Sequence, residues 1–167
     1  MEFIINELEK NISVISNLLN SVNNEMISWR PQQDKWCMLE IVCHLYDEER
    51  EDFRFRTKWI LENPGQIPPP FNPLDWIETH QYMQQDYVTM IEKLLVERKQ
   101  SISWLRSLKN PNWASSYDHE KIGTTTAKHY LANWLAHDYL HIRQITKLKF
   151  DYLKSKSGEN LDYAGIW

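Results

Sequence analysis

The sequence predicts an all-α protein folded as a four-helix bundle, and three observations support this fold class. Apolar residues recur at intervals of three and four along four long stretches of the chain, which is the periodicity of amphipathic helices. Prolines and helix-capping residues separate those stretches. No stretch of any length alternates apolar and polar residues as a half-buried strand would.

The four predicted helices span about residues 3–22, 36–60, 74–108 and 126–150. The third begins at Leu74 or Thr79, where Asn72 and Pro73 provide a helix-start signal. The preceding segment "ENPGQIPPPFNP" contains five prolines and must be a loop that is partly extended like polyproline. These connections allow antiparallel neighbours in a bundle. The closing segment "LDYAGIW" is aromatic and is expected to dock on the bundle.

Length and composition indicate one domain over residues 1–167 and exclude several classes of function. A chain of 167 residues with 42% hydrophobic residues can bury a core without disulfides or metals. Its net charge of -4 and scattered cations argue against nucleic acid as a partner. No apolar run approaches the roughly 18 residues of a membrane span, and charges interrupt the apolar residues at the amino terminus, so a cytoplasmic location is expected.

The two cysteines are expected to be packing residues. Cys37 and Cys43 lie six positions apart in a predicted helix, which turns one about 240° away from the other and separates them by about 9 Å along the axis. They cannot form a disulfide with each other while that helix is intact.

Histidines on the predicted inward faces of two helices are the candidate site. In the fourth helix the apolar stripe that contains Trp134 continues through positions 137, 138 and 141, so His137 and His141 lie where leucines would be expected. Their spacing places the Cβ atoms about 5 to 6 Å apart, close enough for both imidazoles to bind one ion. In the second helix, His44 also faces inward, and Glu48 follows it one turn later.

Two interpretations of these histidines remain open from the residues alone. Each could be a hydrogen-bonded core residue, because a buried polar group without a partner costs about 1 to 3 kcal/mol. Alternatively, three neutral imidazoles could bind a divalent cation and leave a coordination position for water or substrate. His80, His119 and His129 are interpreted as surface residues or as residues that form local hydrogen bonds, and "DEEREDFRFR", residues 47–56, is interpreted as a mostly solvated helix face.

Three motifs resemble the DinB-like superfamily of four-helix bundles, and more closely its YfiT-like branch of metal-dependent hydrolases and thiol transferases. They are "WCMLEIVCHLYDEE", "FRFR" with the proline-rich loop after it, and "HDYLHIRQI". The resemblance implies that His44, His137 and His141 bind a divalent metal, with zinc or nickel expected. One departure is Cys37, where the family commonly has Ser or Thr as a helix cap; Glu40 supplies the other half of the capping box.

The resemblance implies an enzyme that joins a low-molecular-weight thiol to a small electrophile, or a related hydrolase. Glu48 and Asp138 are candidates for orienting the imidazoles or accepting a proton. Tyr130 and Trp134 are expected to line the cavity, and Trp76 with the proline-rich loop to cover its mouth. The alternatives are a noncatalytic metal-binding stress-response bundle and a metal-free interaction module. A homodimer is also compatible with the sequence.

Overall fold

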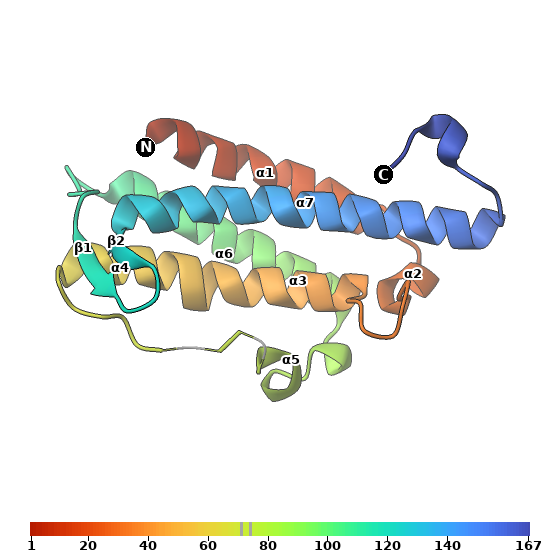
Figure 1. Cartoon of the computed structure of the whole chain (residues 1–167), viewed down its shortest axis with the longest axis horizontal. Helices are drawn as coiled ribbons and strands as arrows, with labels where there is room; N and C mark the ends of the chain where they lie inside the picture. Colours follow the sequence, from red (N-terminus) through yellow and green to blue (C-terminus); the bar gives the residue numbers. More distant parts are fainter. Residues whose placement is uncertain (71, 74) are drawn as a thin grey trace.

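The computed structural model describes residues 1–70, 72–73 and 75–167, and it confirms the predicted all-α four-helix bundle (Figure 1). One side of the bundle is a composite helix, in which α3 (Met38–Asp47) continues through the π-helix η1 (Glu48–Arg54) into α4 (Phe55–Glu62). The other three bundle helices are α1 (Glu2–Asn20), α6 (Tyr87–Ser107) and α7 (Ala127–Ser157).

The order of the helices around the bundle differs from a simple up-and-down arrangement. α1 packs against α6 and α7, whereas α3 packs against α6 and α4 packs against α7, so α1 and the composite helix lie across the diagonal. α1 and α7 run in one direction, and α6 and the composite helix run in the other (Figure 1). Neighbours that run in the same direction need a connection about as long as the bundle, so the expectation of antiparallel neighbours holds only in part.

The proline-rich segment provides that long connection between α4 and α6. The composite helix of residues 38–62 is about 37 Å long at a rise of 1.5 Å per residue. An extended polyproline-like chain advances about 3.1 Å per residue, so residues 63–75 could cover the same distance. The predicted helix start at Leu74 lies outside the described residues, and the structure instead has α5 (Trp76–Thr79), the short 3-10 helix η2 (Tyr82–Gln84) and then α6.

Side-chain caps mark the starts of α3, α6 and α7. Asp86 accepts a hydrogen bond from the backbone nitrogen of Thr89 at the start of α6, at 2.8 Å. Thr126 accepts one from the backbone nitrogen of His129 at the start of α7, at 3.0 Å. At the start of α3, Glu40 accepts a hydrogen bond from the backbone nitrogen of Cys37 at 2.9 Å, and the Cys37 thiol completes the capping box. The Cys37 thiol, which is a weaker cap than the hydroxyl of Ser or Thr, therefore caps α3.

Two shorter features were not predicted. Strands β1 (Ser116–His119) and β2 (Gly123–Thr126) form an antiparallel hairpin ahead of α7, and α2 (Asn24–Ser28) follows α1. The hairpin is too short to show a recognisable alternation, and it buries Tyr117 against Ile60 and Ala127. The prediction that strands are absent was therefore wrong at this place.

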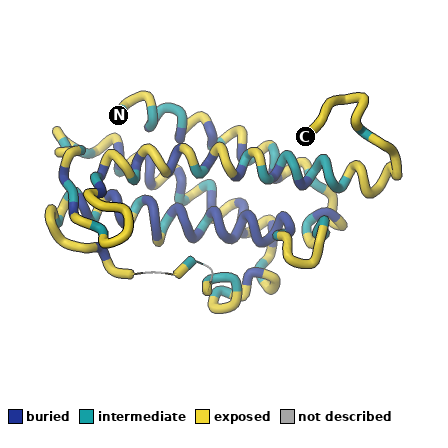
Figure 2. The backbone as a smooth tube through the Cα atoms, in the orientation of Figure 1, coloured by how far each residue is buried: buried dark blue, intermediate teal, exposed yellow. Residues whose placement is uncertain are grey.

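The interpretation of residues 47–56 as a mostly solvated face was also wrong. The run carries several polar residues that the structure buries: Asp47, Glu48, Glu49, Asp52 and Arg56. The π-helix has a wider turn than an α-helix, and it directs consecutive residues such as Glu48 and Glu49 into the bundle. Figure 2 shows this stretch of the composite helix as largely buried.

A buried ion network centred on Arg98 of α6 joins all four sides of the bundle. The Arg98 guanidinium, only 3% exposed, donates two hydrogen bonds of 2.7 Å to the two carboxylate oxygens of Asp138 on α7. It also donates to Glu49 of η1 at 2.8 Å and to the Leu8 carbonyl of α1 at 3.3 Å. Asn11 and Trp134 donate to the same two carboxylates. The network therefore fixes the rotation of α7 and η1 against α6.

The carboxy-terminal segment docks only through its last residue. Trp167 stacks on Phe150 of α7 with ring centroids 5.4 Å apart. Tyr163 and Ile166 are almost fully exposed, so the expectation that the whole segment would dock was wrong. Both cysteines are buried and free, as expected. Among the residues that the structure describes, no helix combines the length and apolar character that crossing a bilayer requires.

Replacing Arg98 should destabilise the protein more than replacing any exposed cationic residue does. Arg98→Met leaves Glu49 and Asp138 buried without their counter-ion, and we expect a loss of about 3–5 kcal/mol in the free energy of unfolding. Lys99→Met, at an exposed neighbouring position, should change it by less than about 0.5 kcal/mol. Urea unfolding followed by circular dichroism measures both. Equal midpoints for the two variants would contradict the role assigned to the network.

Candidate metal centre

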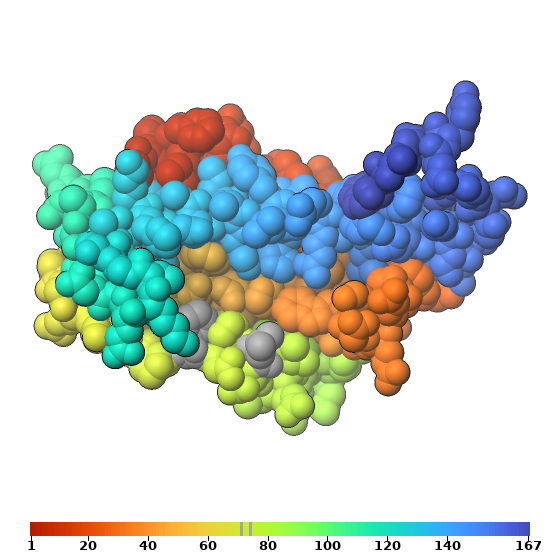
Figure 3. Space-filling view, viewed as in Figure 1, coloured from red at the N-terminus to blue at the C-terminus, as the bar shows by residue number. Residues whose placement is uncertain are grey.

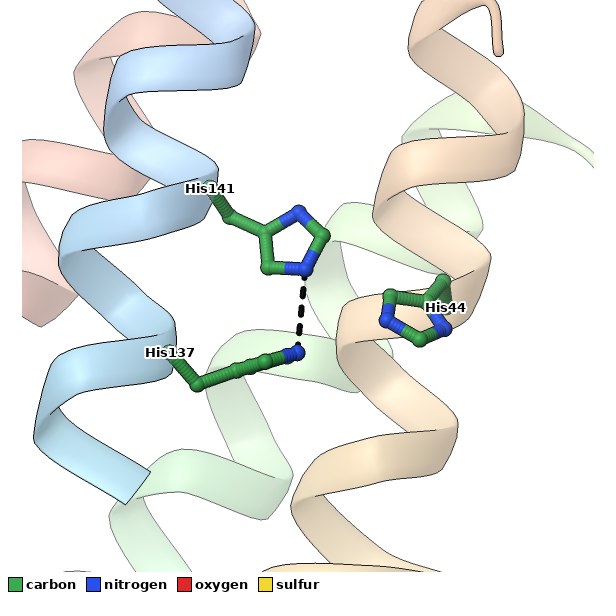
Figure 4. A group of neighbouring side chains, drawn as sticks. All are labelled: His44, His137 and His141. Atoms are coloured by element: carbon green, nitrogen blue, oxygen red, sulfur yellow. Dashed lines mark hydrogen bonds between the residues drawn. The ribbon is translucent and has the colours of Figure 1, made fainter. Parts of the chain in front are cut away.

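Three histidine side chains meet between the composite helix and α7. His44 lies on α3, and His137 and His141 lie one turn apart on α7 (Figure 4). One nitrogen atom from each ring can be chosen so that the three lie within 4.8 Å of one another. His137 Nε2 and His141 Nε2 are 3.0 Å apart. The structure thus brings together the three residues selected from the sequence, while their binding of a metal stays a prediction.

Aromatic side chains hold two of these rings in place. Trp36, just before α3, packs its ring against that of His44 with centroids 4.7 Å apart and planes at 67°. Phe53 of η1 lies 4.9 Å from the ring of His137 and stacks on Trp134 behind it. These contacts surround the histidines with apolar surface and limit the rotation of their rings.

Burial keeps the three imidazoles neutral. Desolvation, reinforced by the neighbouring His141 ring, lowers the pKa of His44 to about 3 and that of His137 to about 2. Desolvation also lowers the pKa of His141. Neutral imidazoles have a free lone pair, which is the form that binds metal ions. The three rings are therefore in the ligand form throughout the physiological pH range.

Glu48 lies beside the cluster and belongs to a polar chain that leads away from it. Its Oε1 atom is 3.9 Å from His44 Nε2. Burial, reinforced by the charge of Asp52, raises the pKa of Glu48 to about 8, so this carboxyl group carries a proton at neutral pH and shares it with Asp52. Asp52 forms an ion pair of 2.7 Å with Arg56, whose guanidinium donates to the Pro69 carbonyl at 3.1 Å.

Asp138 lies next to His137 in the sequence but on the far side of the histidine cluster. Its carboxylate accepts hydrogen bonds from Arg98 and Asn11, and among the described residues no hydrogen bond or ion pair joins it to an imidazole ring. Asp138 belongs to the Arg98 network, which holds α7 in place. Burial lowers the pKa of His141, and the negative charge of Asp138 opposes that effect. Of the two predicted orienting residues, Glu48 is therefore the one within reach of a histidine ring.

A cleft of about 710 Å³ opens on His141. It lies between the loop before α3 and the carboxy-terminal half of α7, with Trp36 and Ile41 on one side and Leu140 and Leu148 on the other. Trp167 forms part of its rim. Figure 3 shows the loop, α7 and the carboxy-terminal segment together on one face.

The cleft is not lined by the residues that the sequence suggested. Trp134 is 1% exposed and donates a hydrogen bond to Glu49, and Tyr130 shares a hydrogen bond with Tyr117, so both belong to the interior and to the hairpin end. Trp76 stacks on His80 at a centroid distance of 6.0 Å. The expectations that Tyr130 and Trp134 line the cavity and that Trp76 covers its mouth were therefore wrong.

The donor atoms of the cluster fit a divalent cation. Zinc–imidazole bonds of about 2.0–2.1 Å place the nitrogens on one ion roughly 3 to 4 Å apart, and the two Nε2 atoms on α7 are already 3.0 Å apart. Within the described ranges, the Nδ1 atom of His44 is buried without a hydrogen-bond partner, so this ring is not saturated by protein contacts. Three histidine ligands would leave a position for water or a substrate.

Sequence reasoning missed Arg98, Glu49 and the hydrogen bond that Arg56 donates to the Pro69 carbonyl of the proline-rich loop. Arg98 occupies a position of the apolar stripe that also contains Leu94 and Ile102, and a charge on that stripe was the available signal. No comparable signal marked Glu49, because the π-helix changes the register of its face.

The raised pKa of Glu48 predicts how a neutral replacement changes stability. Because the folded state holds a proton that the unfolded state releases above the ordinary pKa of 4.5, Glu48 weakens the fold as the pH rises from 4.5 to about 8. We compare the free energies of unfolding of metal-free Glu48→Gln and metal-free parent protein. The difference between them should shift in favour of the variant by about 2–4 kcal/mol when the pH is raised from 5 to 9. Urea unfolding at both values measures this difference.

Glu51→Gln is the matched control, since Glu51 is an exposed residue of the same π-helix. Its effect on stability should change little over this pH range. A Glu48→Gln effect that is the same at pH 5 and pH 9 would show that Glu48 is ionised in the folded protein.

Comparison with known proteins adds independent information on the family. The model of the DinB superfamily matches residues 7–145. A protein of Oceanobacillus iheyensis named "Putative metal-dependent hydrolase OB0782" is 23% identical over 146 residues, which are 86% of this chain and 83% of that protein. YfiT from Bacillus subtilis, described as "a probable metal-dependent hydrolase with an unusual four-helix bundle topology", shares the fold with a TM-score of 0.77 at 18% identity, over 95% of this chain and 88% of the YfiT chain. Since the family match extends over most of its residues, this chain belongs to the DinB superfamily.

Proposed function

We propose that His44, His137 and His141 bind one divalent cation and that the protein is a metal-dependent enzyme acting on small electrophiles. The observation that carries the proposal is the meeting of three neutral imidazoles, those of the buried His44 and His141 and of the half-buried His137, beside a cleft that reaches His141 and is wide enough for a small molecule. The names of the Oceanobacillus iheyensis protein and of YfiT, both of which refer to metal-dependent hydrolases, support it.

Zinc or nickel is the expected metal. Imidazole is a borderline ligand that suits zinc, copper, iron and nickel better than it suits magnesium or calcium, which prefer oxygen. When bound, the metal would act as a Lewis acid toward a water or thiol that reaches its open position. Both hydrolysis and the transfer of a low-molecular-weight thiol follow from this chemistry.

The protein side chains would provide orientation, shelter and proton exchange. Trp36 and Phe53 exclude water from one side of the imidazoles, while the cleft leaves access at His141. Glu48 is the titratable group nearest to the ligands, with Oε1 3.9 Å from His44 Nε2. Its proton is shared with Asp52, so it could exchange a proton with a reacting water or thiol without creating an isolated buried charge.

The described residues favour catalysis over a purely structural metal. A structural site is closed by four protein ligands, whereas this cluster contains three groups able to bind an ion among residues 1–70, 72–73 and 75–167. The fold is also stabilised independently of the cluster by the Arg98 network and the apolar core. A metal that served only the fold would need neither the cleft nor a fourth open position.

Removing any one histidine of the cluster should abolish stoichiometric metal binding. We expect the protein to hold about one zinc or nickel ion per chain after loading and gel filtration, and His44→Ala, His137→Ala and His141→Ala to bind it more than about a hundredfold more weakly. Elemental analysis by mass spectrometry measures the bound ion. His129→Ala, an exposed histidine on the same helix as His137, should retain the full amount. Equal metal content in His137→Ala and His129→Ala would remove the proposed centre.

The reaction class can be tested with two simple electrophiles. Metal-loaded protein should accelerate either the hydrolysis of p-nitrophenyl acetate or the reaction in which the cysteine thiol replaces the chlorine of 1-chloro-2,4-dinitrobenzene and releases chloride and a proton, and chelation should remove the activity. Dependence of the rate on cysteine concentration distinguishes thiol transfer from hydrolysis. A fully loaded protein that accelerates neither reaction, nor related esters and aryl halides, would favour a noncatalytic role for the metal.

A further inference from the structure

The cleft beside His141 has a charge opposite to that of the whole protein. The chain carries a net charge of -4. The cleft, however, is lined by three cationic residues, Lys35, Arg143 and Lys147, and by one acidic residue, Asp151. Asp151 is already in an ion pair with Lys147. Two cationic side chains therefore remain without an acid in the lining itself.

Arg143 is the more informative of these two cations. Within the part of the chain that the structure describes, no hydrogen bond or ion pair engages its guanidinium, whereas Arg30, Arg54, Arg98 and Arg106 are all paired. Lys35 contacts only the exposed Asp34, at 3.1 Å, in a pair that solvent screens. The N–H donors of an arginine guanidinium lie in one plane, and two of them can donate parallel hydrogen bonds to the two oxygens of a carboxylate.

The helix spacing places these cations near the proposed metal. Arg143 follows His141 by two residues on α7, about 3 Å along the helix axis and about 200° around it, so Arg143 is exposed at the edge of the cleft while His141 faces inward. Lys147 follows His141 by six residues, about 9 Å along the axis. All three side chains line the same cleft. A molecule with its reactive group at the imidazoles could therefore extend an anionic group toward Arg143 without leaving the cleft.

The rest of the cleft suits an apolar or aromatic body. Trp36, Leu140, Leu148 and Trp167 contribute apolar surface to the lining that also contains His141 and the cations. A volume of about 710 Å³ lies within the range of small-molecule sites, which combine apolar walls with a few placed polar groups. The lining thus combines one candidate metal ligand, apolar walls and cationic side chains.

We propose that this cleft selects small organic acids and that Arg143 binds their carboxylate while the apolar walls hold the rest of the molecule. This inference rests on the proposed function for the reaction at the histidines, but the binding of the acid does not require the metal. Arg143 is here a specificity-determining residue, and Lys35 adds long-range attraction.

The test compares an acid with its neutral amide on the same protein. Indole-3-propionate and indole-3-propionamide have nearly the same size and aromatic body, and isothermal titration calorimetry measures both affinities at low salt. We expect the acid to bind about threefold to tenfold more tightly, as an accessible arginine–carboxylate contact provides. Arg143→Gln should remove this preference and Arg143→Lys should keep part of it, whereas Lys128→Gln, an exposed cation near the start of α7, should leave it unchanged.

The titrations are run on metal-free and metal-loaded protein so that the two proposals can fail separately. An acid preference that depends on Arg143 in both forms supports this inference even if the protein shows no catalysis. Equal binding of acid and amide by the metal-free parent, or an acid preference that persists in Arg143→Gln, overturns it. Retention of the full metal content by Arg143→Gln shows that the loss comes from the cleft and not from the metal centre.

Discussion

The buried contact between Arg98 and the carboxylates of Asp138 and Glu49 determines how the helices of this bundle face one another. A guanidinium so deeply buried is stable only when its charge is matched, so α7 must turn Asp138 toward α6 and η1 must do the same with Glu49. Each of these acids follows a residue of the histidine site directly in the sequence: Asp138 follows His137 on α7, and Glu49 follows Glu48 on the composite helix. Pairing the charges thereby sets the rotation that brings His137 and His141 opposite His44.

The π-helix η1 helps to position the histidine cluster from the side of the composite helix. Its wide turn lets Glu48 approach the histidines while Glu49 reaches Arg98, which an α-helix would direct about 100° apart. Phe53 from the same segment then covers His137. The outcome is an asymmetric environment: the imidazoles are enclosed by aromatic rings and a protonated carboxyl group on the bundle side, and they meet a cationic, partly apolar cleft at His141.

The sequence was sufficient to predict the bundle and the residues of the histidine cluster, because both depend on helical periodicity. His44, His137 and His141 stand where the pattern requires apolar residues, and such a substitution is visible without coordinates. The buried acids of η1 were not visible, because a π-helix shifts the face that a 3.6-residue period assigns. The cleft was misplaced because it lies beside a loop, and its lining depends on how residues 31–36 return to α7. The cationic edge of the cleft escaped notice because Lys35 and Arg143 are far apart in the chain.

The central claim is that three imidazoles from two helices share one cation. X-ray absorption spectroscopy at the edge of the bound metal, on protein loaded with one equivalent of zinc, measures the ligands directly. We predict three imidazole nitrogens at about 2.0–2.1 Å, recognised by scattering from the atoms of their rings, together with one oxygen ligand that exchanges with solvent. A first shell composed of oxygen atoms alone, or one that contains sulfur from the cysteines, would contradict it.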